Sequence, residues 1–403
     1  MKLQGRRRHI WVVVSVGLVL VVAASVVAAL ILTNVAKTPS TPTQVTKPVP
    51  KPVGITSNTL FFGNAFWGRY MNDWSMASPL KTAYPFSRLN EFNRQDYDAW
   101  IAGLECPTVA NFTQTSAQED STLSFNCSPD YLPEAAKWFT AFTLANNHTD
   151  NRGAEGFTET KQHLEENKIQ YFGHYDPTQL DDVCEVIAMP VKVTYDDKSV
   201  KEQSLPFAMC GFHGVFQIPP EESLAVMEKY SELMPVIAMP HMGVEYKPAP
   251  DQLKTATYRS MIDHGADMVI GDHPHWIQTT ESYKGHLIVY SMGNFMFDQQ
   301  DTAEVVRSAA INVKIGVNGA ESTDLSKWLT LGDSCKAFHD DCLAKITSEG
   351  LTKLPFEYQF GVVGTNDSGK ITKPATPDQQ ASILQRLNWT QTMSQLQAPY
   401  SSL

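Results

Sequence analysis

The sequence predicts an α/β fold behind an N-terminal transmembrane helix, and two observations support this. Residues 11–33 form one uncharged run of mostly Val, Ala, Leu and Ile. Beyond residue 54, short apolar runs alternate with segments whose apolar residues recur at helical spacing. Alternating strands and helices of this kind indicate an α/β fold with a mixed or parallel sheet.

The first 33 residues are predicted to be a basic cytoplasmic tail (1–10) followed by a membrane anchor (11–33). As a helix, the apolar run would span roughly 34 Å, enough for a hydrocarbon core of about 30 Å. The four basic residues before it should stay in the cytoplasm. A cleaved signal peptide is the alternative, with Ala23, Ala24 and Ser25 as a cleavage region, but its apolar core is normally only about 7–15 residues. Both interpretations place the remaining chain outside the cytoplasm, and the anchor predicts a single-pass protein of the cell membrane with an extracellular domain.

Residues 34–53 hold five prolines with threonine and lysine, and predict an extended, partly polyproline linker. No other break of this kind follows, so residues 54–403 are predicted to form one extracellular domain. Near its end, Pro377 to Ser394 predicts a terminal helix that packs on this domain.

The formal net charge of −11 is unevenly distributed. Residues 1–10 carry +4 and the linker carries +3, whereas residues 54–403 hold 25 basic and 43 acidic side chains. This balance argues against a nucleic-acid binder, which needs a basic surface. An anionic polymer would also be repelled within a Debye length of about 8 Å, so its binding needs bound cations or a local basic patch.

Six cysteines outside the cytoplasm permit disulfides, and they allow 15 full pairings. Proximity in sequence favours Cys106–Cys127, Cys184–Cys210 and Cys335–Cys342. Free buried thiols are the alternative, and no CxxC spacing indicates a zinc ribbon.

Within the domain, the elements follow one another in a regular order. Strands are predicted at 59–62, around 100–101, and at 142–145, 169–172, 206–210, 235–239, 268–270 and 287–290. Helices are predicted at 155–167, 221–233 and 252–264. The strands are short apolar runs bounded by glycine, proline or polar residues.

Most of these strands end in a carboxylate, amide or imidazole, where α/β folds carry their functional loops. The candidates are Asn64, Glu105, Asn147, His148, His241, His273 and His275. Mixed nitrogen and oxygen ligands suit Mn, Fe or Zn, and Pro274 stiffens the turn that carries two of the histidines. Asp272 is expected to orient a ligand. The alternative is a hydrogen-bonded polar rim, and His174 and His213 are weaker candidates for lining a cleft.

At these residues the chain resembles the CapA family of capsule-biosynthesis proteins, which is associated with poly-γ-glutamate synthesis. The resemblance covers about residues 58–300. The matching elements are Gly63-Asn64 through Gly68-Arg69, Gly103-Leu104-Glu105, Asn146-Asn147-His148, His241-x-Gly243-x-Glu245-Tyr246, Gly265 through His275, and Tyr290 through Phe295.

The resemblance implies a four-layer α/β/β/α metallophosphoesterase-like sandwich that binds one or two divalent ions. Glu105 would bridge the ions; Asn147, His241 and His273 would hold one of them, and Asn64 and His275 the other. His148 would be the general acid. Arg69 would act beside it, and Glu245, Tyr246, Asp272 and Asn294 would contact the substrate or support the ligands.

Three positions depart from the pattern. Asn64 replaces an aspartate, Gly103 replaces an asparagine, and Phe66 stands where metallophosphoesterases place a histidine ligand. A neutral amide neutralises less charge, so the second ion is expected to be held loosely or to be absent.

The favoured interpretation is a membrane-anchored, metal-dependent hydrolase in poly-γ-glutamate capsule synthesis or export. One alternative is a non-catalytic accessory subunit of the polymer synthase, and another is a surface phosphoesterase or nucleotidase. The predicted partners are the membrane, synthase subunits and the anionic polymer, without nucleic acid.

Overall fold

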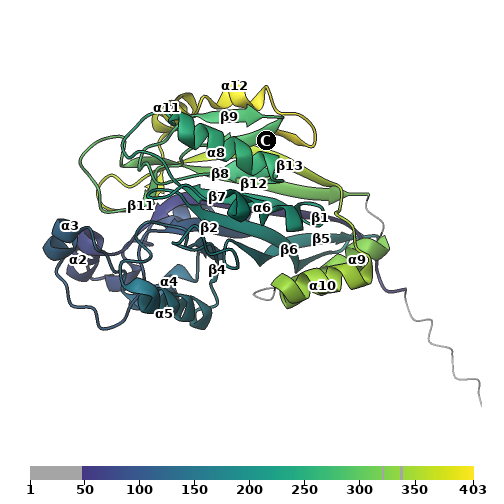
Figure 1. Ribbon diagram of the computed structural model, residues 1–403, viewed down its shortest axis with the longest axis horizontal. Coiled ribbons are helices and arrows are strands. Elements are labelled where there is room, and N and C mark those ends of the chain that lie inside the picture. The colour runs from purple at the N-terminus through teal and green to yellow at the C-terminus, as the bar shows by residue number, and fades with distance from the viewer. Residues whose placement is uncertain (1–47, 320–321, 336–338) are drawn as a thin grey trace, which may run out of the picture. The chain divides into compact units, whose positions relative to one another are not determined.

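The computed structural model describes residues 48–319, 322–335 and 339–403 (Figure 1). The predicted tail, the predicted anchor and most of the predicted linker lie outside these residues. In the part of the chain that is described, no helix is long and apolar enough to cross a membrane. Pro50–Leu403 form one compact unit.

The predicted α/β class is confirmed, with strands and helices alternating along the chain. The strands are β1 (Pro52–Ala65), β2 (Ala99–Leu104), β3 (Ala141–Thr143), β4 (Gln170–Phe172), β5 (Cys184–Tyr195), β6 (Val200–His213), β7 (Val236–His241), β8 (Met268–Ile270), β9 (Thr280–Tyr283), β10 (His286–Val289), β11 (Asn294–Met296), β12 (Arg307–Asn318), β13 (Phe356–Asn366), β14 (Lys373–Pro374) and β15 (Tyr400–Ser402). The α-helices are α2 (Arg69–Ala77), α3 (Ser116–Thr122), α4 (Leu132–Ala135), α5 (Gly153–Glu166), α6 (Glu221–Ala225), α7 (Glu228–Ser231), α8 (Gln252–Asp263), α9 (Ser322–Leu331), α10 (His339–Glu349), α11 (Pro377–Leu387) and α12 (Trp389–Met393). Short 3-10 helices are η1 (Lys81–Ala83), η2 (Leu89–Phe92), η3 (Arg94–Asp96), η4 (Pro129–Tyr131) and η5 (Gly332–Cys335).

Several boundaries differ from the predicted ones. β1 begins at Pro52, so the last two residues of the predicted linker belong to the sheet. The single helix predicted at 221–233 is two short helices, α6 and α7. The predicted terminal helix is divided into α11 and α12 at Asn388, which has a positive φ of 55° and caps the first helix.

The strand β1 is the junction of the mixed sheet. Its first half pairs antiparallel with β5, and its second half pairs parallel with β2. One branch then continues through β3 and β4, and the other continues through β6, β7, β8, β10 and β9. β12 pairs with β1 antiparallel over eight positions, from Gly54 to Phe61. The C-terminal part of the chain therefore supplies a central strand.

Alternating side chains of β1–β4 enter two different apolar clusters. Phe61, Ile101 and Phe172 join the cluster that contains the core of β5–β8. Leu60 and Trp100 point to the other side and pack with residues of α4 and α5. The two branches thus pack on one another, and helices cover their outer faces (Figure 1). Assignment to the metallophosphoesterase class stays a prediction.

The structure joins the six cysteines in the three predicted pairs, Cys106–Cys127, Cys184–Cys210 and Cys335–Cys342.

Strands β1 to β4 run parallel to one another, as do β6 to β8. The antiparallel steps from β1 to β5 and from β5 to β6 give both groups the same direction. Their carboxyl ends therefore meet at one edge, where the candidate residues lie.

Candidate functional site

The backbone at this edge is unusual in two ways. His273 and His275, which follow β8, have positive φ values of 89° and 59°. For residues with a Cβ atom this region is strained, and such strain concentrates at functional sites. Gly63 lies so close to the residue before β11 that a Cβ at position 63 would be 1.8 Å from the carbonyl oxygen of Gly293. Only glycine allows β1 and β11 to approach in this way.

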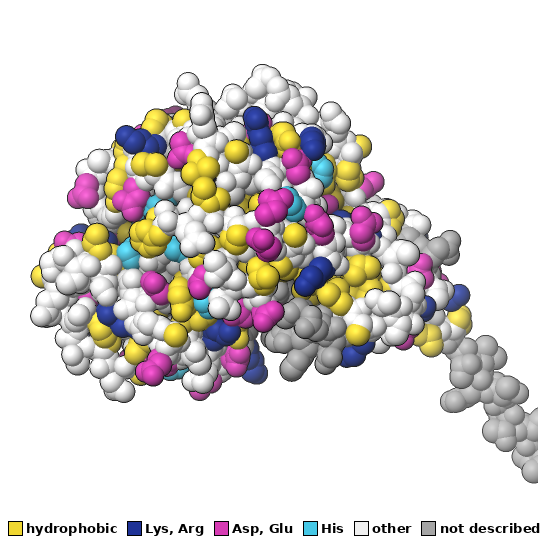
Figure 2. Space-filling model, in the orientation of Figure 1, with side chains coloured by type: hydrophobic (Ala, Val, Ile, Leu, Met, Phe, Trp, Pro, Cys, Tyr) yellow, Lys and Arg dark blue, Asp and Glu magenta, His cyan; other side chains and the backbone are white. Residues whose placement is uncertain are grey.

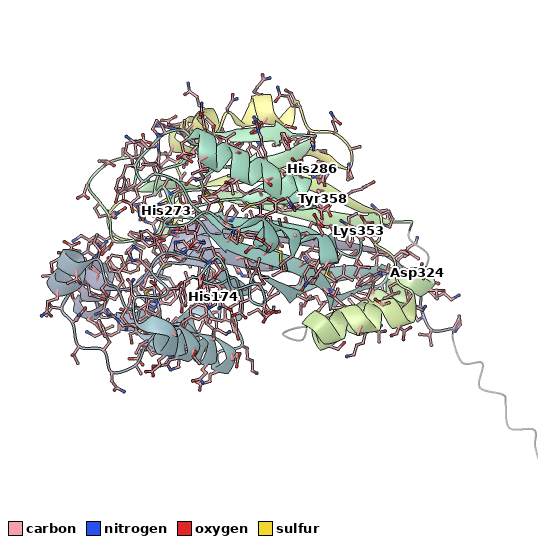
Figure 3. All side chains as sticks on the ribbon, in the orientation of Figure 1. His174, His273, His286, Asp324, Lys353 and Tyr358 are labelled. Atoms are coloured by element: carbon pink, nitrogen blue, oxygen red, sulfur yellow. A yellow bond between two sulfur atoms is a disulfide. The ribbon has the colours of Figure 1, made fainter. Side chains whose placement is uncertain are left out.

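The centre of the site is a group of three side chains that lie at or just after the ends of β3, β7 and β8. The Nε2 atom of His241 lies 2.8 Å from Oδ1 of Asn147 and 3.1 Å from Nδ1 of His273. Figure 3 shows His273 at the edge where the strands end. These three side chains converge although they are up to 126 positions apart in the sequence, and their role as metal ligands stays a prediction.

The hydrogen bonds around His241 favour a cation at this point. Its Nδ1 atom lies 2.6 Å from Oδ1 of Asp272, an acceptor, so the imidazole carries its proton on Nδ1. The lone pair of Nε2 then faces the amide oxygen of Asn147 at 2.8 Å and Nδ1 of His273 at 3.1 Å. A metal ion satisfies such a pair of lone pairs, and a carboxylate behind a ligating histidine is the usual support.

A second group surrounds His275. Its Nδ1 atom lies 2.8 Å from Oδ1 of Asn294, which leaves Nε2 directed toward Glu105 at 4.0 Å and Glu245 at 3.9 Å. Asn64 donates through Nδ2 to Asn294 at 3.3 Å, while its own Oδ1 is buried without a hydrogen-bond partner in the described residues. These oxygen and nitrogen atoms form a looser set than the group around His241.

Among the described residues, no three His, Cys, Asp or Glu side chains come close enough together to hold a metal by themselves. The convergent set contains only two histidines, and the amide of Asn147 is its third member. The ring of Phe66 stacks on that of Phe297 at 4.8 Å. The histidine ligand that the resemblance leads one to expect at this position is therefore replaced by a packed apolar side chain. The donor set therefore fits one ion at Asn147, His241 and His273 better than a pair of ions.

Burial sets the protonation of the site. It lowers the pKa of His241 and His273 well below the ordinary value, and neighbouring histidines add to the effect. Burial also lowers the pKa of His275 to about 4 and raises that of Asp272 to about 7. The pKa of Glu105 is raised well above its usual range, first by burial and then by Asp272. Neutral imidazoles are the form that binds metals, and a nearby cation would restore the carboxylates.

His148 lies beside this group in a fixed tautomer. Its Nδ1 atom is 3.0 Å from Oδ1 of Asn151, and that oxygen also accepts the backbone N–H of Phe125. Nδ1 is therefore the donor, and Nε2 is free to exchange a proton. Burial lowers the pKa of His148 to about 4, so the ring is neutral at pH 7.

Arg69 is held by carboxylates. Its guanidinium binds Asp298 through Nε at 2.7 Å and through a terminal nitrogen at 2.6 Å, and it binds Asp120 at 2.9 Å. Both Arg69 and Asp298 are buried. The structure thus places Arg69 in an internal ion-pair network beside the site, where most of its donors are used.

On the solvent side, Tyr246 stacks on His275 with ring centroids 5.5 Å apart, and its hydroxyl accepts a hydrogen bond from Gln299. Glu245 precedes it and is exposed. These two predicted substrate residues do lie beside the histidines, and their roles stay predictions.

Four residues near the site were missed or given low weight in the sequence. Asn146 donates to Glu105 at 3.0 Å and lies 3.3 Å from His241. Asp298 binds Arg69, and Lys254 is a buried cation whose pKa falls to about 7 because of burial. His213 ends β6 as His241 ends β7. For His213, the sequence gives one signal of a functional position, which is its place directly after an apolar run. For Lys254, no nearby residue indicates that the side chain is buried.

Comparison with known proteins supports the resemblance. Residues 58–193 and 221–299, just over half of the chain, match the family described as "Bacterial capsule synthesis protein PGA_cap". The chain is 26% identical over 276 residues to "Capsule biosynthesis protein CapA" of Bacillus anthracis, covering 65% of each chain. It is 26% identical over 257 residues to "PGA biosynthesis protein CapA" of Bacillus subtilis, covering 59% of this chain and 63% of the relative. The matches thus span slightly less than two thirds of these relatives.

A search of solved structures finds a phosphatase of Mycoplasma pneumoniae with a TM-score of 0.37 and 11% identity, covering 81% of this chain and 96% of that one. A protein of Thermus thermophilus matches with a TM-score of 0.35 and 12% identity, over 63% and 93% of the two chains. At these scores the likeness supports no conclusion about this chain.

Proposed function

The chain belongs to the bacterial capsule synthesis protein PGA_cap family, and from this membership we propose that it is a membrane-anchored, metal-dependent hydrolase acting at the cell surface during capsule synthesis or export. The substrate class proposed is a γ-glutamyl-type amide, the bond of a poly-γ-glutamate capsule. The name of the Bacillus subtilis relative, a PGA biosynthesis protein, motivates this choice.

One observation carries the proposal: the lone pair of His241 Nε2 faces the amide oxygen of Asn147 at 2.8 Å, with His273 at 3.1 Å. Asn147, His241 and His273 would hold the ion. A bound Mn, Fe or Zn ion would polarise the scissile group and activate water.

The residues of the chain perform the remaining tasks. Asp272 keeps the proton of His241 on Nδ1, which presents Nε2 to the ion. Asn151 keeps the proton of His148 on Nδ1, so that Nε2 takes up a proton and later delivers it to a leaving group. Tyr246 covers His275 and restricts the access of water to this side.

The accessory-subunit alternative is favoured by the second group. Asn64 is neutral, Phe66 is not a ligand, and Arg69 is occupied by Asp298 and Asp120. A site that holds one ion instead of two would suit a protein that binds the polymer through that cation without cutting it.

The deciding experiment uses the full-length chain in detergent, with metal content measured by mass spectrometry. Hydrolysis of poly-γ-glutamate and of p-nitrophenyl phosphate is then assayed with added Mn²⁺, for the wild type and for His273→Ala. We expect about one ion per chain and metal-dependent cleavage of the amide polymer, both lost in H273A. Stoichiometric metal without turnover would favour the accessory role. Turnover of the phosphoester alone would favour the phosphoesterase, and absence of metal would refute the metal site.

The membrane anchor is proposed separately, because residues 11–33 lie outside the described residues. N-terminal sequencing of the protein purified from membranes tests it. A mature N-terminus near residue 25 would show that the segment is a cleaved signal peptide.

A further inference from the structure

Four histidines near the site share one arrangement. In each, Nδ1 is bound to an acceptor supplied by the protein, so that Nε2 carries the lone pair. The acceptors are Asp272 for His241, Asn294 for His275, Asn151 for His148, and the backbone carbonyl of Tyr175 for His213. The first three belong to the site already described. His213 has no role there.

The position of His213 places it in the same site. It ends β6 and is the register partner of His241 at the end of β7, so both side chains point to the same side of the sheet. The backbone N–H of Gly214 continues the pairing by donating to the carbonyl of His241 at 2.9 Å. The charges of His148 and His241 are each coupled electrostatically to His213.

The Nε2 atom of His213 is a buried acceptor that lacks a donor. His213 is only 5% exposed, and its Nε2 atom has no hydrogen-bond partner among the described residues. A carbonyl oxygen can only accept, so the contact with Tyr175 requires the proton on Nδ1. Burying such an acceptor without a partner is unfavourable, and a bound molecule that donates a hydrogen bond would remove this cost.

We propose that His213 is a substrate-binding residue of this site, and that its Nε2 atom accepts a hydrogen bond from an amide N–H of the bound polymer. The amide identity rests on the proposed function, whereas the requirement for a donor rests on the tautomer alone. This hydrogen bond selects a linkage that carries N–H over one that carries only oxygen.

The charged side chains around His213 are consistent with a bound group that is neutral and donates a hydrogen bond. Arg69 is bound to Asp298 and Asp120, and Lys254 is fully buried, so neither of these cations is free to meet a phosphate. Next to His213, the ring of Phe216 packs edge-on at 5.6 Å and is 78% exposed. An exposed aromatic ring beside a buried acceptor suits the methylene groups that flank an amide. Figure 2 shows hydrophobic and histidine side chains lying together near the left side of this face.

The test compares two variants with opposite chemistry. At position 213, asparagine can place its Nδ2 group where Nδ1 of His213 donates to the carbonyl of Tyr175, but it has no atom at the place of Nε2. Glutamine can reach the place of Nε2 with an oxygen, but it loses the bond to Tyr175. His286→Asn is the matched control, because His286 also lies against a carbonyl, that of Asp267 at 3.0 Å, and Figure 3 shows it well away from His273.

The probes are a γ-glutamyl dipeptide and its ester analogue, in which oxygen replaces the amide N–H. Their dissociation constants are measured by calorimetry with the full-length, Mn²⁺-treated chain. We expect the wild type and H286N to prefer the amide by about tenfold, as one hydrogen bond predicts. H213N should lose this preference while keeping its metal content and melting temperature, and H213Q should retain part of it.

Equal amide preference in the wild type and H213N would overturn the proposal, as would a wild type that binds neither probe. A preference lost in H213Q and kept in H213N would show that His213 acts only by tying down Tyr175, which also overturns it. Metal content is read separately in every variant. A wild type without metal would refute the proposed hydrolase while the amide–ester comparison still decides the role of His213.

Discussion

The Nδ1 atom of His241 lies 2.6 Å from Oδ1 of Asp272, and both side chains are buried. This pair fixes which nitrogen of His241 faces Asn147 and His273. Its carboxylate comes from the residue directly before His273, so one short loop supplies both a candidate ligand and the support of another.

The first prediction concerns this pair. Asp272→Ala should lower the affinity for Mn²⁺ or Zn²⁺ by about 10- to 100-fold, because His241 loses both its fixed tautomer and part of its basicity. Calorimetric titration of the metal-free protein measures the change. Asp263→Ala, at an exposed position in α8, is the control and should bind as the wild type does. Unchanged affinity in D272A would show that the pair has no part in metal binding.

The second prediction concerns Gly103, which approaches Asp272 closely. A Cβ at this position would lie 2.5 Å from Oδ2 of Asp272 and 3.7 Å from the nearest atom of Thr143. Gly103→Ala should therefore displace the carboxylate and weaken metal binding about tenfold. Gly316→Ala is the matched control, because its nearest neighbour is 3.8 Å away in another strand. Equal metal affinities in the two variants would contradict the proposed contact.

Much of this site was predictable because its signals are local. Each parallel strand near it is a short apolar run that ends in a polar residue, and parallel strands bring such ends together. The strand β12 was also readable, since Ile311, Val313, Ile315 and Val317 alternate with other residues. This strand lies beyond residue 300, where the resemblance ends, and it was not among the predicted strands.

Contacts between distant residues were not predictable from one sequence. Asp298 lies 229 positions from Arg69, and nothing near either residue indicates that they meet. The burial of Lys254 is a tertiary effect, because its helix presents the lysine to the interior beside Tyr258. Strand ends can be read locally, whereas the partners of buried charges depend on the folded chain.

The third prediction distinguishes two roles of Arg69. Arg69→Ala should destabilise the protein by about 3–5 kcal/mol, because the buried carboxylate of Asp298 loses its cation and keeps only the backbone N–H of Tyr70 at 3.1 Å. Arg69→Lys should also destabilise, since a lysine cannot make the two-point contact. Urea unfolding measures both. A stable R69K variant with an increased KM would instead indicate that Arg69 binds the substrate.

The fourth prediction concerns the acid sensitivity of the metal-free protein. Burial lowers the pKa of His148 to about 4 in the folded state, against an ordinary value near 6.5. Between these values the unfolded chain binds more protons than the folded one, so the free energy of unfolding falls as the pH decreases from 6.5 to 4. The contribution of His148 should be about 2 kcal/mol, because the ring keeps some contact with water.

His148→Gln removes this titration and should make the stability less dependent on pH in that window. Urea unfolding at pH 7, 5.5 and 4.5, with a chelator present, measures the difference between variant and wild type. An identical slope in H148Q and the wild type would mean that His148 titrates alike in the folded and unfolded states. His148 would then carry a proton at mildly acidic pH and act as a general acid without the help of a bound ion.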